Sequence, residues 1–244
     1  MFSNFVINYG HFLFRYRNAL FPVILLILVI IFPPRPAANN INLDFWMDVV
    51  GILIIISGQV IRASVIGLVY IKRGGVNKKI HADTLVQDGI FAHCRNPLYV
   101  GNILILLGFL VIHNNPWVYL CGCTFYLFSY YAIVKAEESF LQEKFGDEFK
   151  QYCNNVSRWL INFSGITETL RSMQFNWRRV IAKDYTTILT WFLTVILLVS
   201  LEHITFYDSG LTWSLVIQMV PLVVVALLLS GIVKGLKKNG KLSG

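Results

Sequence analysis

Six long apolar stretches constrain the fold of this chain more than any other feature of its sequence. They cover residues 18–34, 49–71, 98–112, 116–134, 186–201 and 211–233, and Arg62 is the only Lys, Arg, Asp or Glu within them. A helix of about 20 apolar residues crosses the hydrocarbon core of a bilayer. The charged fraction of 14%, against roughly 25% in an average soluble domain, argues against a water-soluble globule. The sequence predicts an all-α, polytopic transmembrane helical bundle of about six spans.

The distribution of basic residues predicts the orientation of these spans. Of the 21 Lys and Arg residues, 19 lie in four segments that fall on the same side when the spans alternate: 1–17, 72–97, 135–185 and the tail after 233. Cytoplasmic loops carry such an excess, so both termini are expected in the cytoplasm. A cleaved secretory signal is the alternative reading of Arg15 and Arg17 ahead of an apolar run. We favour an uncleaved helix, because prolines follow the run where small residues would mark cleavage.

Three regions follow from this division. Residues 1–73 hold a first pair of transmembrane helices, 74–165 a loop, a helical hairpin and a polar helix, and 166–244 an amphipathic connector and a last helix pair. The formal net charge of +8 is explained by topology, so no nucleic-acid partner is expected. Four scattered cysteines without a Cys-x-x-Cys pair, and five dispersed histidines, predict no metal site and no disulfide scaffold.

The loop before the third span contains the first candidate site. Asp88-Gly89 is typical of a turn, and Pro97 suits the first turn of a helix with Asn96 as its N-cap. The third span has only 15 residues, and we expect its helix to continue into this loop. Arg95 lies where free backbone N–H groups already favour an anion, so a carboxylate or phosphate could bind there. Contact with lipid phosphate is the alternative.

Two adjacent carboxylates follow the fourth span. Apolar residues at helical spacing predict that this helix leaves the membrane and ends at Gly146. Neighbouring helical residues diverge by about 100°, so Glu137 and Glu138 cannot both face solvent. At least one should point into the bundle and need a cationic partner. An ion pair with Arg95 or Lys135, without any ligand, is the simpler alternative.

Arg62 is the third polar feature. It lies nine residues before the end of its predicted span, with Gln59 one turn away. That depth is about 13 Å at 1.5 Å per residue, which exceeds easy snorkelling to the interface. An ionised group so deep usually faces a partner or a cavity, which makes Arg62 a functional candidate.

Together these segments resemble a known family. The pattern Gly89-x-Phe91-x-x-x-Arg95-x-Pro97-x-Tyr99-x-Gly101, followed by Glu137-Glu138 and later by Tyr152 and Arg158, is similar to that of integral-membrane methyltransferases. This family includes isoprenylcysteine carboxyl methyltransferases and phospholipid N-methyltransferases. The resemblance covers roughly residues 49–160, and Gly51, Gly58, Arg62 and Gly67 match its weaker preceding helix.

The resemblance implies use of S-adenosylmethionine without a Rossmann fold, and methyl transfer to an amphiphilic acceptor from the bilayer at a site on the cytoplasmic side. The residues it assigns to cofactor binding are Arg95, Asn96, Pro97, Tyr99, Gly101, Glu137, Glu138, Tyr152 and Arg158. Arg62 and Arg95 are the catalytic candidates, which could orient an acceptor carboxylate or phosphate. Asn96 stands where many relatives have histidine, which weakens the case for a catalytic base there.

Two other functions remain open from the sequence. An NADPH-dependent membrane sterol or enone reductase shares the Arg-x-Pro-x-Tyr element, although the Glu137-Glu138 pair argues against it. A non-catalytic lipid-binding or transport protein could use the same scaffold. Residues 166–244 receive no functional assignment, and the lysines of the tail are most simply topology determinants.

Overall fold

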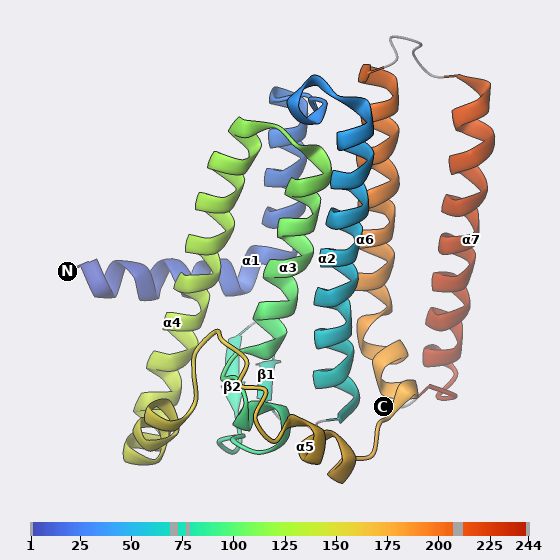
Figure 1. Ribbon diagram of the computed structural model, residues 1–244. Coiled ribbons are helices and arrows are strands. Elements are labelled where there is room, and N and C mark those ends of the chain that lie inside the picture. The colour runs from blue at the N-terminus through green and yellow to red at the C-terminus, as the bar shows by residue number, and fades with distance from the viewer. Residues whose placement is uncertain (1, 69–72, 77–78, 207–211, 243–244) are drawn as a thin grey trace.

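The computed structural model describes residues 2–68, 73–76, 79–206 and 212–242 (Figure 1). Its long helices are α1 (Phe2–Ile31), α2 (Ile41–Leu68), α3 (Pro97–His113), α4 (Pro116–Asn155), α6 (Trp177–Phe206) and α7 (Trp213–Lys238), with a short α5 (Ile166–Ser172). Two 3₁₀ turns, η1 (Ala37–Asn39) and η2 (Gly89–Ala92), and an antiparallel pair of short strands, β1 (Arg73–Val76) and β2 (Lys79–Ala82), complete these elements.

The all-α membrane bundle is confirmed. Among the described residues, five helices are long and apolar enough to cross a membrane, and α3 is a shorter apolar helix of 17 residues. Each predicted span falls on one of these six helices, except that residues 69–71 and 211 lie outside the described part of the chain. The predicted helical hairpin is formed by α3 and α4. In its turn Asn114 adopts a left-handed conformation, and the Asn115 side chain accepts a hydrogen bond from the backbone N–H of Trp117 at 2.9 Å.

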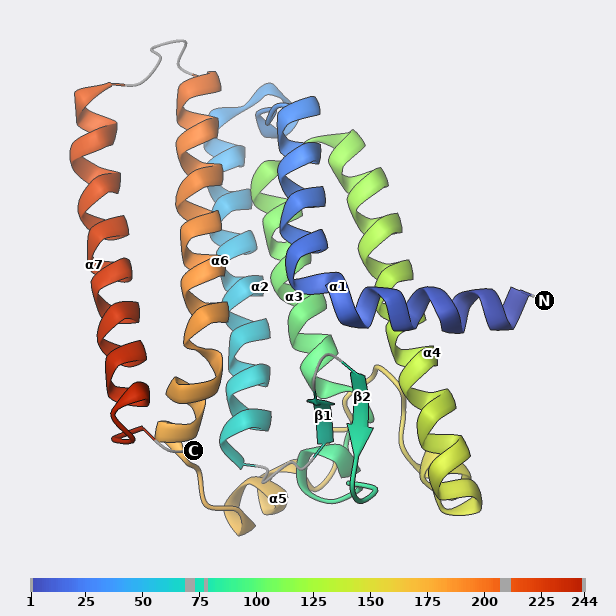
Figure 2. The same cartoon turned by 180° about the vertical axis from the view of Figure 1, so that it is seen from behind.

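The first helix differs from its prediction because it begins 16 residues before the predicted span. Its first part runs across α4 and its second part stands parallel to the other helices (Figures 1 and 2). Gly10 permits the crossing, since a Cβ there would lie 2.0 Å from the Ala132 carbonyl oxygen. Pro22 lies inside the helix and cannot donate the usual backbone hydrogen bond, which accounts for a change of direction. The predicted span began just after Arg15 and Arg17, whereas the helix runs through both residues.

Two helix boundaries lie next to the candidate site. The third helix begins at Pro97 with Asn96 at the N-cap position, as predicted, although it extends no further into the loop, where the separate turn η2 lies. The fourth helix does not end at Gly146. It kinks there, with φ 53° and ψ −121°, and continues to Asn155. Leu141 before the kink and Phe149 after it belong to one apolar cluster, so packing extends the helix past the glycine.

Close contact between α2 and α3 organises the centre of the bundle. The two helices are antiparallel neighbours, and paired glycines seven residues apart lie at their contact: Gly51 opposite Gly108, and Gly58 opposite Gly101. A Cβ on Gly58 would lie 2.5 Å from the carbonyl oxygen of Gly101, and one on Gly108 would lie 2.6 Å from that of Gly51. Small residues that bring two backbones together are a common means of association between membrane helices.

We expect Gly108→Ala to destabilise the bundle, because the new methyl group would overlap backbone of α2. Overpacking of this kind costs about 1–3 kcal/mol, and the thermal unfolding midpoint in detergent should fall. Gly231→Ala is the matched control, since a Cβ on this α7 glycine meets no atom within 4 Å. That variant should be neutral or slightly stabilising through helix propensity. Equal effects of the two substitutions would contradict the role of the glycine contact.

Candidate functional site

Arg95, Glu138 and Arg158 meet at the end of the bundle that carries η2 and α5. The Arg158 guanidinium donates two hydrogen bonds to the Glu138 carboxylate, at 2.8 and 2.7 Å. Arg95 Nη1 lies 3.5 Å from Glu138 Oε1, and its side chain is 11% exposed. The two guanidiniums thus contact one carboxylate, in charge-assisted hydrogen bonds from Arg158 and an ion pair from Arg95. Arg95 therefore meets Glu138 and Arg158, which lie more than 40 positions later in the sequence.

The loop on which Arg95 lies is held by backbone hydrogen bonds to the segment after α4. The backbone N–H of Arg95 donates to the Ser157 carbonyl at 2.9 Å. Asn96 occupies the N-cap position, but its side chain does not cap the helix and instead donates to the Arg158 carbonyl at 3.2 Å. Tyr152 donates its hydroxyl to the Phe91 carbonyl at 2.7 Å. These contacts fix the two guanidiniums relative to each other.

This cluster holds two guanidiniums and one carboxylate, so it keeps one positive charge. Hydrogen bonding to Glu138 raises the pKa of Arg158 above its ordinary value, so this guanidinium stays ionised. Burial raises the pKa of the Cys94 thiol, which donates weakly to the Arg158 carbonyl at 3.7 Å. Cys94 is accordingly a neutral, unreactive thiol that packs behind the loop.

Glu137 points to the other side of α4, into the bundle, as the helical geometry predicts. It accepts a hydrogen bond from the Tyr99 hydroxyl, and that hydroxyl accepts one from Arg17 Nη1 at 2.8 Å. Tyr99 and Glu137 are 8% and 9% exposed. The cationic group near Glu137 is therefore Arg17 of α1, which the sequence analysis treated only as a topology determinant. The position of Arg17 before an apolar run did not indicate that it would contact the Tyr99–Glu137 pair.

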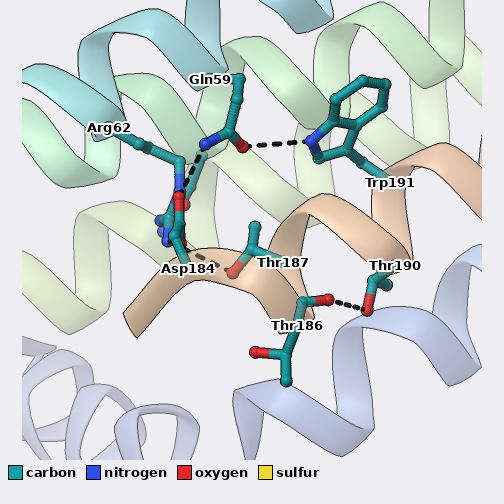
Figure 3. A network of polar contacts seen from close by, with 8 residues as sticks. Gln59, Arg62, Asp184, Thr186, Thr187, Thr190 and Trp191 are labelled. Atoms are coloured by element: carbon teal, nitrogen blue, oxygen red, sulfur yellow. Dashed lines mark hydrogen bonds and ion pairs between the residues drawn. The ribbon is translucent and has the colours of Figure 1, made fainter. Parts of the chain in front are cut away.

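Arg62 reaches a partner that the sequence analysis did not assign. Its guanidinium forms an ion pair with Asp184 of α6, whose side chain is 1% exposed, and also donates to Asn102 of α3. Gln59 donates to the same carboxylate at 2.7 Å and accepts from the Trp191 indole at 3.1 Å (Figure 3). The buried charge is thus shared by three helices, α2, α3 and α6. One sequence feature could have identified Asp184 as a candidate partner: it is an acid just before an apolar run.

Gly101 and Pro97 have clear structural positions. Pro97 is buried at the first position of α3. Gly101 faces α2, where a Cβ would lie 2.7 Å from both the Gly58 carbonyl oxygen and Arg62 Cγ. The missing side chain is therefore required for helix packing and for the passage of Arg62. Its assignment to close cofactor approach stays a prediction from the resemblance.

A polar cavity of about 570 Å³ lies among α1, α2, α3, α4 and α6. Its lining includes Arg17, Arg62, Lys183, Asn102 and Tyr130. Three cationic side chains line this cavity and no carboxylate is among its described lining residues, so the cavity is expected to attract anions. Arg17 also places the Tyr99–Glu137 pair beside this cavity.

A second, apolar cavity of about 300 Å³ adjoins the first. Both are lined by Phe21, Pro22, Leu106 and Thr190, and the second continues between aliphatic residues of α1 and α6 such as Leu25 and Leu197. A cationic chamber joined to an apolar one matches the shape of an amphiphile with an anionic head and a hydrocarbon chain.

Comparison with known proteins is consistent with this geometry. Residues 46–148 match the family model described as phospholipid methyltransferase. The chain is 29% identical over 126 residues to human protein-S-isoprenylcysteine O-methyltransferase and 28% identical over 126 residues to the mouse protein, which is 50% of this chain in each case. A Haemophilus influenzae protein described as uncharacterized is 35% identical over 63 residues, which are 26% of this chain and all of that protein. No solved structure matches.

These findings define the class: the chain is a polytopic helical membrane protein. Its residues 46–148 are similar to the phospholipid methyltransferase family, and about half of the chain is similar to isoprenylcysteine methyltransferases. The matched region spans 43% of the human relative and 44% of the mouse relative, so the chain covers less than half of their length.

We expect Asp184→Ala to destabilise the protein strongly, because it leaves the Arg62 guanidinium buried without its counter-ion. Removal of one partner from a buried ion pair costs about 3–5 kcal/mol, which thermal or denaturant unfolding in detergent would detect. The double variant Arg62→Met/Asp184→Leu should recover most of this loss. Asp83→Ala removes an acid that is 57% exposed and should change stability little. A single-variant loss no larger than this control would show that the pair does not hold α2 against α6.

Proposed function

We propose that this protein transfers a methyl group from S-adenosylmethionine to an anionic amphiphile that enters from the bilayer. The observation that supports this proposal is the adjacency of two differently charged sites. The Arg95–Glu138–Arg158 cluster lies next to the Tyr99–Glu137 pair, and Arg17 connects that pair to the cationic cavity.

The residues of the first site suit the proposed cofactor. Arg95 Nε is buried and has no hydrogen-bond acceptor among the described residues, so this guanidinium retains a donor for a ligand carboxylate. Glu137 and Glu138 supply acceptors for an ammonium group and ribose hydroxyls. The cofactor supplies a methyl group on a positively charged sulfur, for which carboxylates and aromatic faces are favourable neighbours.

The cationic cavity is the proposed acceptor site. Arg62 is held by Asp184 and Asn102, and its orientation is therefore fixed before any ligand binds. Arg17 of α1 and Lys183 of α6 line the same cavity and would neutralise a carboxylate or phosphate head, while the apolar cavity would receive its hydrocarbon chain. The relatives' names specify isoprenylcysteine, and the family model specifies phospholipid. Both acceptor types carry an anionic group beside a long apolar tail.

The chain's own contribution to the reaction is positional. A carboxylate acceptor needs no proton removed, so the protein has to desolvate it and align it rather than supply a base. Arg62 and Arg17 hold the head, and Tyr99 bridges the two sites by one hydrogen bond on each side. An amine acceptor would have to lose a proton, and the two carboxylates that contact residues beside the cavity are Asp184, which is paired with Arg62, and Glu137, which accepts from Tyr99. We place this site on the cytoplasmic side, following the Lys and Arg distribution.

Glu138→Gln should weaken cofactor binding at least tenfold, because it removes the charge that orients both guanidiniums. Titration calorimetry of the detergent-purified protein with S-adenosylhomocysteine measures this directly. Glu143→Gln is the matched control, since Glu143 is an exposed acid on the same helix. Binding of NADPH instead of S-adenosylhomocysteine by the unmodified protein would favour the reductase function, and binding of neither would favour a non-catalytic lipid-binding role.

Lys183→Gln should raise KM for the acceptor roughly fivefold to tenfold, with cofactor affinity unchanged, because it removes one charge from the cavity only. Methyl transfer from labelled cofactor to a prenylated cysteine and to a phospholipid amine would identify the acceptor and provide the assay. Arg178→Gln removes an exposed positive charge from the same helix outside the cavity. Parallel effects of the two substitutions would argue against Lys183 as an acceptor contact.

A further inference from the structure

Three carboxylates gather at the end of the bundle opposite the Arg95 cluster. Asp44 and Asp48 lie in the first two turns of α2, and Glu202 lies near the end of α6. These two helix ends are at the same extremity of the molecule, away from α5 and the strands (Figure 1). One carboxylate oxygen from each residue lies within 4.8 Å of the others.

The charge of this cluster is only partly compensated by the chain. Asp44 is 4% exposed and accepts hydrogen bonds from the Ala37 backbone N–H at 3.0 Å and from Asn114 Nδ2 at 3.4 Å. Glu202 is also 4% exposed, and both of its carboxylate oxygens are buried without a hydrogen-bond donor in the described part of the chain. Asp48 Oδ1 is likewise buried without a hydrogen-bond donor in this part of the chain. Within those described residues, no Lys or Arg forms an ion pair with the cluster.

Buried carboxylates this close together repel one another and lose their hydration, so they need either protons or a cation between them. A proton shared between Asp48 and Glu202 would remove the repulsion between these two carboxylates. At least one buried oxygen of Glu202 would still have no hydrogen-bond donor. A cation would satisfy all three residues at once. The unpartnered oxygens of Glu202 point to this second solution, because they already face the other two carboxylates.

We propose that Asp44, Asp48 and Glu202 bind a hard divalent cation of the calcium type. Oxygen donors alone, with no sulfur or nitrogen in the cluster, select such ions. Two oxygens on one Ca²⁺ ion can be about 5 Å apart at most, since each lies at roughly 2.3–2.6 Å from it. The observed spacing fits that limit. The sequence analysis expected no metal because it considered cysteine and histidine spacing, whereas these acids come from two distant helices.

The ion would fasten α2 to α6 at one end, while Arg62 and Asp184 fasten the same two helices closer to the other end. Because α6 supplies Lys183 to the cationic cavity and Asp184 to Arg62, the metal would help to set the position of that wall. The cation site itself lies outside the cavity and does not depend on the methyl-transfer proposal.

Terbium luminescence tests the site in the full chain. Tyr119 donates to Asn114, which in turn contacts Asp44, so aromatic excitation should sensitise a bound Tb³⁺ ion. After treatment with a chelator, the purified protein should bind one Tb³⁺ saturably, Ca²⁺ should displace it, and Ca²⁺ should raise the thermal unfolding midpoint. Glu202→Gln and Asp48→Asn should each lower the affinity at least tenfold. Glu168→Gln, an exposed acid on α5, should leave it unchanged.

Failure of the unmodified protein to bind Tb³⁺ or Ca²⁺ saturably would overturn the proposal, whatever the variants do. Equal affinity in the unmodified protein and in both cluster variants would also overturn it, since binding would then lie elsewhere. Under proton sharing, Glu202→Gln should stabilise the chelator-treated protein by removing repulsion, with no response to Ca²⁺. Asp48→Asn provides the same comparison if Glu202→Gln does not fold.

Discussion

The need to compensate every charge buried in an apolar bundle determines how this protein is assembled. Arg62 lies well inside α2, and it can be accommodated only because Asp184 of α6 and Asn102 of α3 meet it there. Arg17 similarly reaches Glu137 through the Tyr99 hydroxyl. An unpaired charge at such a depth costs several kcal/mol. Polar contacts therefore fix which helices are neighbours, in a membrane where apolar surfaces discriminate little between partners.

The glycine contacts between α2 and α3 are the second requirement, because they keep the two helices close enough for the charged groups to meet. Gly101 lets the Arg62 side chain cross the face of α3, and its pairing with Gly58 keeps the two helices close enough for Asn102 to be within reach. A larger residue at either position would move the guanidinium away from its partners. The packing of the bundle and the charge in its cavity are for this reason parts of one arrangement.

Much of this could be predicted from local sequence properties. Apolar length gave the helices. The charges left open an ion pair of one of the two adjacent glutamates with Arg95 or Lys135, and the structure pairs Glu138 with Arg95. The start of α3 at Pro97 also followed from its residue types. The expected helix end at Gly146 was wrong, since a glycine shows where regular backbone is interrupted but not whether packing resumes a helix beyond it. Phe149 decides that question through a contact distant in sequence.

Partners on distant helices could not be predicted, because one sequence does not show which helices are adjacent. Asp184, Arg17 and the carboxylates of the proposed cation site all belong to this group. Each is an ordinary charged residue near the end of an apolar run, and only the three-dimensional arrangement gives it a neighbour. The region without a functional assignment, residues 166–244, proves to supply the counter-ion of Arg62.

The two cavities have walls that lie largely outside the family core. Residues 46–148 match the family model, whereas Arg17, Phe21 and Pro22 come from α1 and Lys183 and Leu197 from α6. On the proposed function, the parts that handle the methyl donor are concentrated in one continuous stretch of chain, and the parts that discriminate among acceptors are attached to either side of it. Evolution could then replace the flanking helices and redirect such a protein to a new lipid without rebuilding its chemistry.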